Sequence, residues 1–178
     1  MRVVSGTFRG LKLETIVEDG IRPTTDKVKE AVFDILQFEI PGKRFLDLFG
    51  GSGQIGIEAA SRGASEVVIV EKNRKALEVI KRNVSKIQGR LNIRVINADA
   101  FDFLAKLYDK IDIAFLDPPY KSDLLEKISD RIGSVMNSEG MIITETASDV
   151  QSRVNIGNFN NIKSYSYGSI MINFYRFK

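Results

Sequence analysis

The chain has 178 residues and a formal net charge of +3, which fits one globular domain of ordinary composition. It contains no cysteine and no histidine, so disulfides, thiolate chemistry, histidine bases and the common zinc sites are excluded, and we expect no metal site. No apolar run approaches about 18 residues, and the first residues lack the apolar core of a signal peptide. We therefore expect a cytoplasmic protein without a membrane segment.

The first 20 residues alternate in hydrophobicity around Gly10 and predict a short hairpin or an extended arm. Arg2, Arg9 and Lys12 give residues 1–13 a positive charge with no acid, which fits either a solvated surface or a contact with nucleic acid. Residues 22–26 predict a turn whose threonines or aspartate cap a helix expected over residues 26–38. We expect one domain over residues 1–178, with residues 1–20 as an arm and residues 21–178 as the catalytic core.

From residue 44 onward, strands and helices alternate, which predicts a mostly parallel, doubly wound α/β sheet. The predicted strands cover residues 44–49, 66–71, 92–97, 111–116 and 141–145. The predicted helices cover residues 54–62, 73–87, 101–108 and 122–135. Residues 161–167 and 169–177 alternate around Gly168 with no helix between them, so we expect an antiparallel hairpin that closes one edge of the sheet.

Four acids, Asp47, Glu71, Asp99 and Asp117, fall at or just after the carboxyl ends of predicted strands, where ligands of open α/β sheets bind. Residues 51–56 fit the pattern G-x-G-x-x-G between a strand and a helix, which is typical of dinucleotide binding, with Glu71 placed to hold a ribose. Each acid alone is more simply a turn residue or a helix cap, and the glycines alone fit a tight turn. Together they predict a ligand site.

The acids favour a cationic ligand, because four carboxylates would repel the anionic pyrophosphate of a dinucleotide. S-adenosylmethionine carries a ribose, an adenine and two cationic groups, and it has no phosphate. We expect Glu71 to accept hydrogen bonds from the ribose hydroxyls and Asp99 to accept one from the adenine amine. Asp47 is expected near the methionine end.

Asp117 stands at the exit of the apolar run 111–116 and is followed by Pro118, Pro119 and Tyr120. The prolines end the strand and leave carbonyl groups without competing N–H donors. Hydrogen bonds from a nucleobase amine to the Asp117 carboxylate and the Pro118 carbonyl would favour a nucleophilic nitrogen and stabilise the positive charge that develops on it. Tyr120 would stack on a base that has left its helix. The simpler alternative is a strand exit stiffened by prolines.

Residues 47–53, Asp-Leu-Phe-Gly-Gly-Ser-Gly, together with residues 117–120 resemble the class I S-adenosylmethionine-dependent amino-methyltransferases. Residues 22–26, Arg-Pro-Thr-Thr-Asp, and residues 56–64, Gly-Ile-Glu-Ala-Ala-Ser-Arg-Gly-Ala, narrow the resemblance to the RsmD family. Members of that family are bacterial enzymes that methylate a guanine N2 amine of small-subunit (16S) ribosomal RNA. Gly50 stands where an alanine is expected, and Lys27 and Lys29 stand where arginines are common, which keeps the charge but weakens bidentate phosphate recognition.

The resemblance implies a seven-stranded methyltransferase sheet, a monomer, and a substrate that is 16S rRNA or a small-subunit assembly intermediate. The residues expected to bind S-adenosylmethionine are Asp47, Phe49, Gly50, Gly51, Ser52, Gly53, Glu71, Asp99 and Ala100. The residues expected in catalysis are Asp117, Pro118, Pro119 and Tyr120. The residues expected to contact the RNA are Arg9, Lys12, Arg22 and Thr24.

Three other functions stay open from the residues. An adenine-N6 DNA methyltransferase shares the motif at residues 117–120, which does not by itself distinguish guanine from adenine, but this chain has little room for a separate target-recognition region. An NAD-dependent oxidoreductase shares the glycine loop but fits the acidic strand ends poorly. A non-catalytic RNA-binding factor could keep the fold, but the intact motif at residues 117–120 argues against it.

Overall fold

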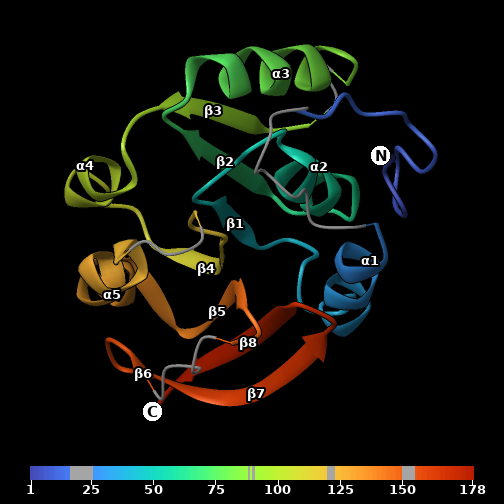
Figure 1. The fold of residues 1–178 in the computed structure, drawn as a ribbon. Coiled ribbons are helices and arrows are strands. Elements are labelled where there is room, and N and C mark those ends of the chain that lie inside the picture. Colours follow the sequence, from blue (N-terminus) through green and yellow to red (C-terminus); the bar gives the residue numbers. More distant parts are fainter. Residues whose placement is uncertain (17–25, 88, 90, 120–122, 150–154) are drawn as a thin grey trace.

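The computed structural model describes residues 1–16, 26–87, 89, 91–119, 123–149 and 155–178, and its elements alternate along the chain as the sequence predicts (Figure 1). The described helices are α1 (Asp26–Ile35), α2 (Gln54–Ser61), α3 (Arg74–Ser85), α4 (Ala100–Ala105) and α5 (Leu124–Val135). The described strands are β1 (Arg44–Asp47), β2 (Glu66–Glu71), β3 (Ile93–Asn97), β4 (Ile111–Leu116), β5 (Met136–Ala147), β6 (Asn155–Ile156), β7 (Phe159–Tyr167) and β8 (Ile170–Phe177). None of the described helices has the length and apolar character needed to cross a membrane.

One sheet contains all of these strands, in the order β3-β2-β1-β4-β5-β8-β7-β6. Strands β1 to β5 pair in parallel, and β8 joins β5 and β7 in antiparallel fashion, which confirms the predicted terminal hairpin. The family resemblance predicts seven strands, whereas the described chain has eight, because the two residues of β6 pair with the start of β7. The strand order reverses between β1 and β4, which is the usual ligand position in this class of sheet.

Helices cover both faces of the sheet, as expected for a doubly wound fold. Helices α1, α2 and α3 pack over one face, in a core that includes Phe45 of β1 and Ile69 of β2. Helices α4 and α5 pack over the other face, in a core that includes Leu46 and Val68. Figure 1 shows these two groups of helices on opposite sides of the strands. Successive residues of β1 and β2 therefore enter different cores, which explains why both strands are apolar on both faces.

The N-terminal arm lies against α2 as a narrow loop and does not form two regular strands. A single backbone bridge joins Arg2 to Lys12. The amides of Val4 and Ser5 donate to the carboxylate of Glu58 in α2, at 2.8 and 3.0 Å. Because a side chain takes these backbone donors, the predicted hairpin cannot extend into a longer ladder.

A buried lysine also anchors the arm. Lys29 Nζ donates to the carbonyl of Arg2 at 2.6 Å and lies 3.6 Å from the carboxylates of Asp26 and Glu58. The side chains of Lys29 and Glu58 are fully buried, and their pairing offsets the cost of taking both charges out of water. The charge that Lys29 keeps is therefore buried and holds the arm, so it is not available to a phosphate.

Candidate functional site

A pocket of about 420 Å³ opens at the carboxyl edge of the sheet, beside the reversal of strand order. Its walls come from the segments that follow β1, β2, β3 and β4, together with the end of the arm and the start of α5. The residues of the sequence-predicted site that line it are Phe49, Gly51, Glu71, Asp99, Ala100, Asp117, Pro118 and Pro119. The structure thus brings five of the nine residues predicted to bind S-adenosylmethionine and three of the four predicted catalytic residues to one space.

The glycine loop connects β1 to α2 in a tight turn. Gly53 N donates to Gly50 O at 2.6 Å, and Gly51 and Gly53 have φ of 53° and 78°, a region that favours glycine. A Cβ added at Gly51 would meet no atom within 4 Å, so a ligand can approach this backbone closely. A Cβ added at Gly50 would collide with Ile69 of β2. Glycine at position 50, where an alanine is expected, therefore leaves room for the side chain of Ile69.

Glu71, the last residue of β2, organises the loops on either side of it. Its Oε2 accepts from Gly51 N at 2.9 Å and its Oε1 accepts from Asn73 N at 2.7 Å. A carboxylate offers about four acceptor positions, so two remain for a ligand. The side chain is fixed in orientation and can still accept hydrogen bonds from a pair of hydroxyls.

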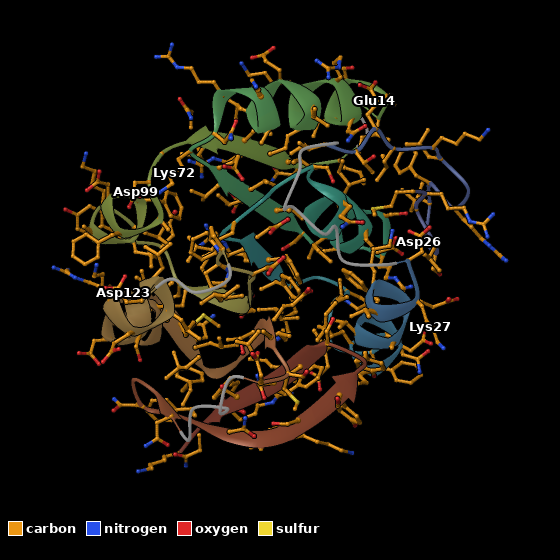
Figure 2. All side chains as sticks on the ribbon, viewed as in Figure 1. Glu14, Asp26, Lys27, Lys72, Asp99 and Asp123 are labelled. Atoms are coloured by element: carbon orange, nitrogen blue, oxygen red, sulfur yellow. The ribbon has the colours of Figure 1, made fainter. Side chains whose placement is uncertain are left out.

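Asp99 is the N-cap of α4 and lines the pocket. It accepts from Phe101 N at 2.9 Å, which caps the helix. Its Oδ2 also lies 3.4 Å from Lys72 Nζ, and Figure 2 shows the two side chains side by side. The Lys72 side chain is 61% exposed and that of Asp99 is 38% exposed, so this ion pair is weak and can give way to a ligand amine.

Asp47 ends β1 but does not line the pocket. Its side chain is 2% exposed and accepts a hydrogen bond from Gly56 N in α2 at 3.0 Å. Burial raises the pKa of Asp47 to about 7, the charge of Glu71 acts in the same direction, and the bond from Gly56 opposes the rise. The other residues predicted to bind S-adenosylmethionine that do not line the pocket are Gly50, Ser52 and Gly53. Gly50, Ser52 and Gly53 belong to the glycine loop itself, and Asp47 holds the start of α2 behind that loop.

Asp117 opens on the pocket directly after β4, and a second acid lies next to it. Leu116 and Thr144 are paired in register, so the residues that follow them, Asp117 and Glu145, are neighbours on adjacent strands. Glu145 is 1% exposed. Burial raises the pKa of Asp117 well above its usual value, and the charges of Glu145 and then Asp47 raise it further. A positive charge in the pocket would relieve this repulsion.

Sequence reasoning missed Glu145 and several lining residues. Glu145 ends the predicted strand 141–145, so the rule that found the other strand-end acids could have included it. Lys72 and Asn73 directly follow β2 and could have been found in the same way. Ile16 and Leu124 come from the arm and from α5, and no local pattern marks either of them as part of the pocket.

The structure does not bring Arg9 and Lys12 to the pocket, although both side chains are exposed. Thr7 N donates to the carbonyl of Ser61 at 2.8 Å, which places the tip of the arm at the C-terminal end of α2. The pocket lies beside the N-terminal end of the same helix, and eight helical residues span about 12 Å. Three further predicted residues, Arg22, Thr24 and Tyr120, lie outside the described residues.

The family model for conserved hypothetical protein 95 matches residues 1–176. The chain belongs to this family. A relative from Bacillus subtilis, YlbH, provisionally named an rRNA methyltransferase, is 34% identical over 181 residues, which cover 99% of this chain and 98% of the relative. The ribosomal RNA small subunit methyltransferase D of Escherichia coli is 34% identical over 157 residues, which cover 88% of this chain and 77% of the relative.

A solved structure agrees with this assignment. The Escherichia coli protein yhhF, provisionally described as a methyltransferase, superimposes with a TM-score of 0.88 at 30% identity, and the match covers 100% of this chain and 98% of that chain. The family member described here therefore has the methyltransferase fold over its length, and its pocket lies at the edge of the sheet where the sequence places the ligand.

Proposed function

We propose that this protein transfers a methyl group from S-adenosylmethionine to the exocyclic N2 amine of a guanine in small-subunit (16S) ribosomal RNA. The observation that carries the proposal is that Asp117 and the two prolines after it face the same pocket as Glu71 and the glycine loop. A motif suited to hold an amine and a motif suited to hold a methyl donor thus share one space. The names of the Escherichia coli and Bacillus subtilis relatives support ribosomal RNA as the substrate.

The charges of the pocket suit S-adenosylmethionine better than a dinucleotide. Glu71, Asp99 and Asp117 contribute three carboxyl groups to the described lining, and Lys72 contributes the one ammonium group. Glu71 would accept from the ribose hydroxyls and Asp99 from the adenine amine, while the open backbone at Gly51 admits the ligand. Asp47 would act from behind the glycine loop, without direct contact with the ligand.

The methyl donor, when bound, supplies an electrophilic methyl carbon attached to a cationic sulfur. Asp117 and the Pro118 carbonyl would accept hydrogen bonds from the guanine amine, direct its lone pair at that carbon and stabilise the charge that develops on nitrogen. The methylated amine must then lose a proton, and Asp117 is suited to take it because burial and Glu145 raise its pKa. Tyr120 would stack on the base.

The residues expected to contact the RNA fall into two groups, one near the pocket and one distant from it. Arg22 and Thr24 would lie near the reacting base. Arg9 and Lys12 would contact phosphates outside the target nucleotide, because the tip of the arm lies at the end of α2 that is remote from the pocket. Such spacing requires an extended substrate, either 16S rRNA or an assembly intermediate of the small subunit, bound by a monomer with a single catalytic domain.

A methyl-transfer assay tests the proposal. Donor with a labelled methyl group is offered with unmethylated small subunits, naked 16S rRNA or duplex DNA, and the products are digested to nucleosides for mass spectrometry. We expect N2-methylguanosine from ribosomal RNA. Calorimetry with S-adenosylmethionine and with NAD gives an independent comparison. Label only in DNA adenine, or binding of NAD without binding of the methyl donor, would contradict the proposal.

A further inference from the structure

A fully buried amide joins the N-terminal arm to the glycine loop. Asn83 of α3 donates through Nδ2 to the carbonyl of Ser52, at 2.9 Å, and to the carbonyl of Glu14, also at 2.9 Å. Its Oδ1 accepts from the amide of Glu14 at 2.8 Å and lies 3.3 Å from Lys86 Nζ. One side chain therefore holds both backbone groups of an arm residue and a carbonyl of the glycine loop.

The two segments that Asn83 joins are both parts of the pocket. Gly51, the neighbour of Ser52, lines it, and so does Ile16, two residues beyond Glu14. The Glu14 carboxylate adds to the attachment, because it pairs with Arg82 Nε at 2.7 Å and with Lys86, and Figure 2 shows Glu14 beside α3. The end of the arm is thus a wall of the pocket, and the Asn83 amide ties it directly to the glycine loop.

This attachment is separate from the one that holds the first part of the arm. Residues 4 and 5 are bound by Glu58, and Ser61 Oγ accepts from Phe8 N at 3.0 Å, all on α2. The arm would stay on the protein through those contacts without Asn83. A buried polar group with several partners is costly to disturb, and here the partners Ser52 and Glu14 stand one and two residues from the lining residues Gly51 and Ile16.

We propose that Asn83 is a positioning residue for the methyl donor, because it latches arm residues 14–16 onto the glycine loop and so couples occupation of the pocket to seating of the arm. The inference rests on the proposed function, in which this pocket holds S-adenosylmethionine. A donor that packs against Ile16 stabilises the seated arm, and by thermodynamic reciprocity a displaced arm binds the donor less tightly.

Amide hydrogen exchange of the wild-type protein tests the coupling without any substitution. S-adenosylhomocysteine, the product of methyl transfer, is the ligand, and its binding is first measured by calorimetry. We expect saturating ligand to slow exchange of the Glu14 amide and of residues 11–16 by about tenfold or more, with little change in the β7–β8 hairpin. Tight binding with unchanged exchange at residues 11–16 would overturn the latch and leave the methyltransferase proposal intact. No binding at all would overturn the methyltransferase proposal and the latch with it.

The substitution Asn83→Asp tests the residue itself. It keeps the shape and the acceptor for Glu14 N, but it turns an oxygen toward two carbonyls in place of the Nδ2 donor. We expect the ligand Kd to rise about tenfold to a hundredfold, with turnover at saturating donor and RNA within about threefold of wild type. Asn92→Asp is the matched control, because Asn92 makes an exposed bond to Ser65 at 3.4 Å, away from the pocket. Equal losses in both variants, or a loss of turnover without a loss of affinity, would refute a positioning role.

Discussion

Replacing Asp47 with asparagine is expected to stabilise the protein at pH 8 and to leave its stability almost unchanged near pH 4. The reason is the setting of this carboxyl group, which is 2% exposed and has a hydrogen bond from Gly56 N. Burial is the main cause that raises its pKa to about 7 from the usual 3.8. Asparagine can accept the same hydrogen bond through Oδ1 and carries no charge to bury.

The size of this stabilisation follows from the proton on Asp47, which the folded chain keeps and the unfolded chain releases. Below pH 4 both states hold it, so Asp47 has no pH-dependent effect. Between about pH 4 and 7 the folded state binds more protons than the unfolded state, so stability falls as pH rises. At about 1.4 kcal/mol for each pH unit, the loss is about 4 kcal/mol and is complete above pH 7.

Urea unfolding of the wild type and of Asp47→Asn at intervals from pH 4 to pH 8 measures this difference. Burial and Glu145 raise the pKa of Asp117 in both proteins, so the difference between the two stability curves reports residue 47 together with its smaller effect on Asp117. Asp34→Asn, at an exposed site on α1, controls for the loss of one negative charge. Curves for wild type and Asp47→Asn that stay parallel within about 1 kcal/mol from pH 5 to pH 8 would refute the reasoning.

Asp117→Ala is expected to lower turnover by at least about a hundredfold, because one electrostatic partner of the transition state is lost. The Kd for S-adenosylmethionine, measured by calorimetry, should change much less. Turnover equal to that of the wild type would mean that this acid is merely structural. Glu71→Gln should weaken the binding of S-adenosylmethionine about tenfold to a hundredfold. The reason is that glutamine has one acceptor oxygen in place of the two that accept from Gly51 N and Asn73 N. Unchanged affinity would refute the role of Glu71. Gly50→Ala should cost about 1–3 kcal/mol in urea unfolding, since its Cβ would collide with Ile69; an unchanged midpoint would contradict that packing.

Local patterns were enough to predict most of the sheet. Strands β2 and β4 run over Glu66–Glu71 and Ile111–Leu116, as predicted, because each is a buried apolar run with clear ends. Strand β5 begins at Met136, five residues before its predicted start. Its early part contains polar residues and pairs irregularly, with a register shift between Ile111 and Ile113 of β4. A prediction from alternating hydrophobicity does not detect the polar early part of β5, because that part belongs to the strand only through its pairing with β4.

The parts of the site that depend on distant partners could not be predicted. Asn83 and Glu14 are 69 positions apart, and Glu58 binds an amide 54 positions away. No sequence pattern assigns a physical role to Asn83 or to Glu58, although Glu58 lies in the segment 56–64 that resembles the RsmD family. The fold gives both side chains the same kind of task, which is to bind backbone groups of an arm that has few partners of its own.

The acids at the carboxyl edge differ in burial, and this difference separates their roles. Asp47 and Glu145 are almost completely enclosed and act on Asp117 through their charge, whereas Asp117 itself faces the pocket. Ionisation makes Asp117 a stronger acceptor of a hydrogen bond from a base amine, and its neighbours oppose ionisation. A cationic methyl donor in the pocket favours ionisation, so we expect donor binding to prepare Asp117 for the base. After methyl transfer the sulfur would carry no charge, so burial and Glu145 would again raise the pKa of Asp117. Asp117 is then able to hold the proton that the methylated amine must lose.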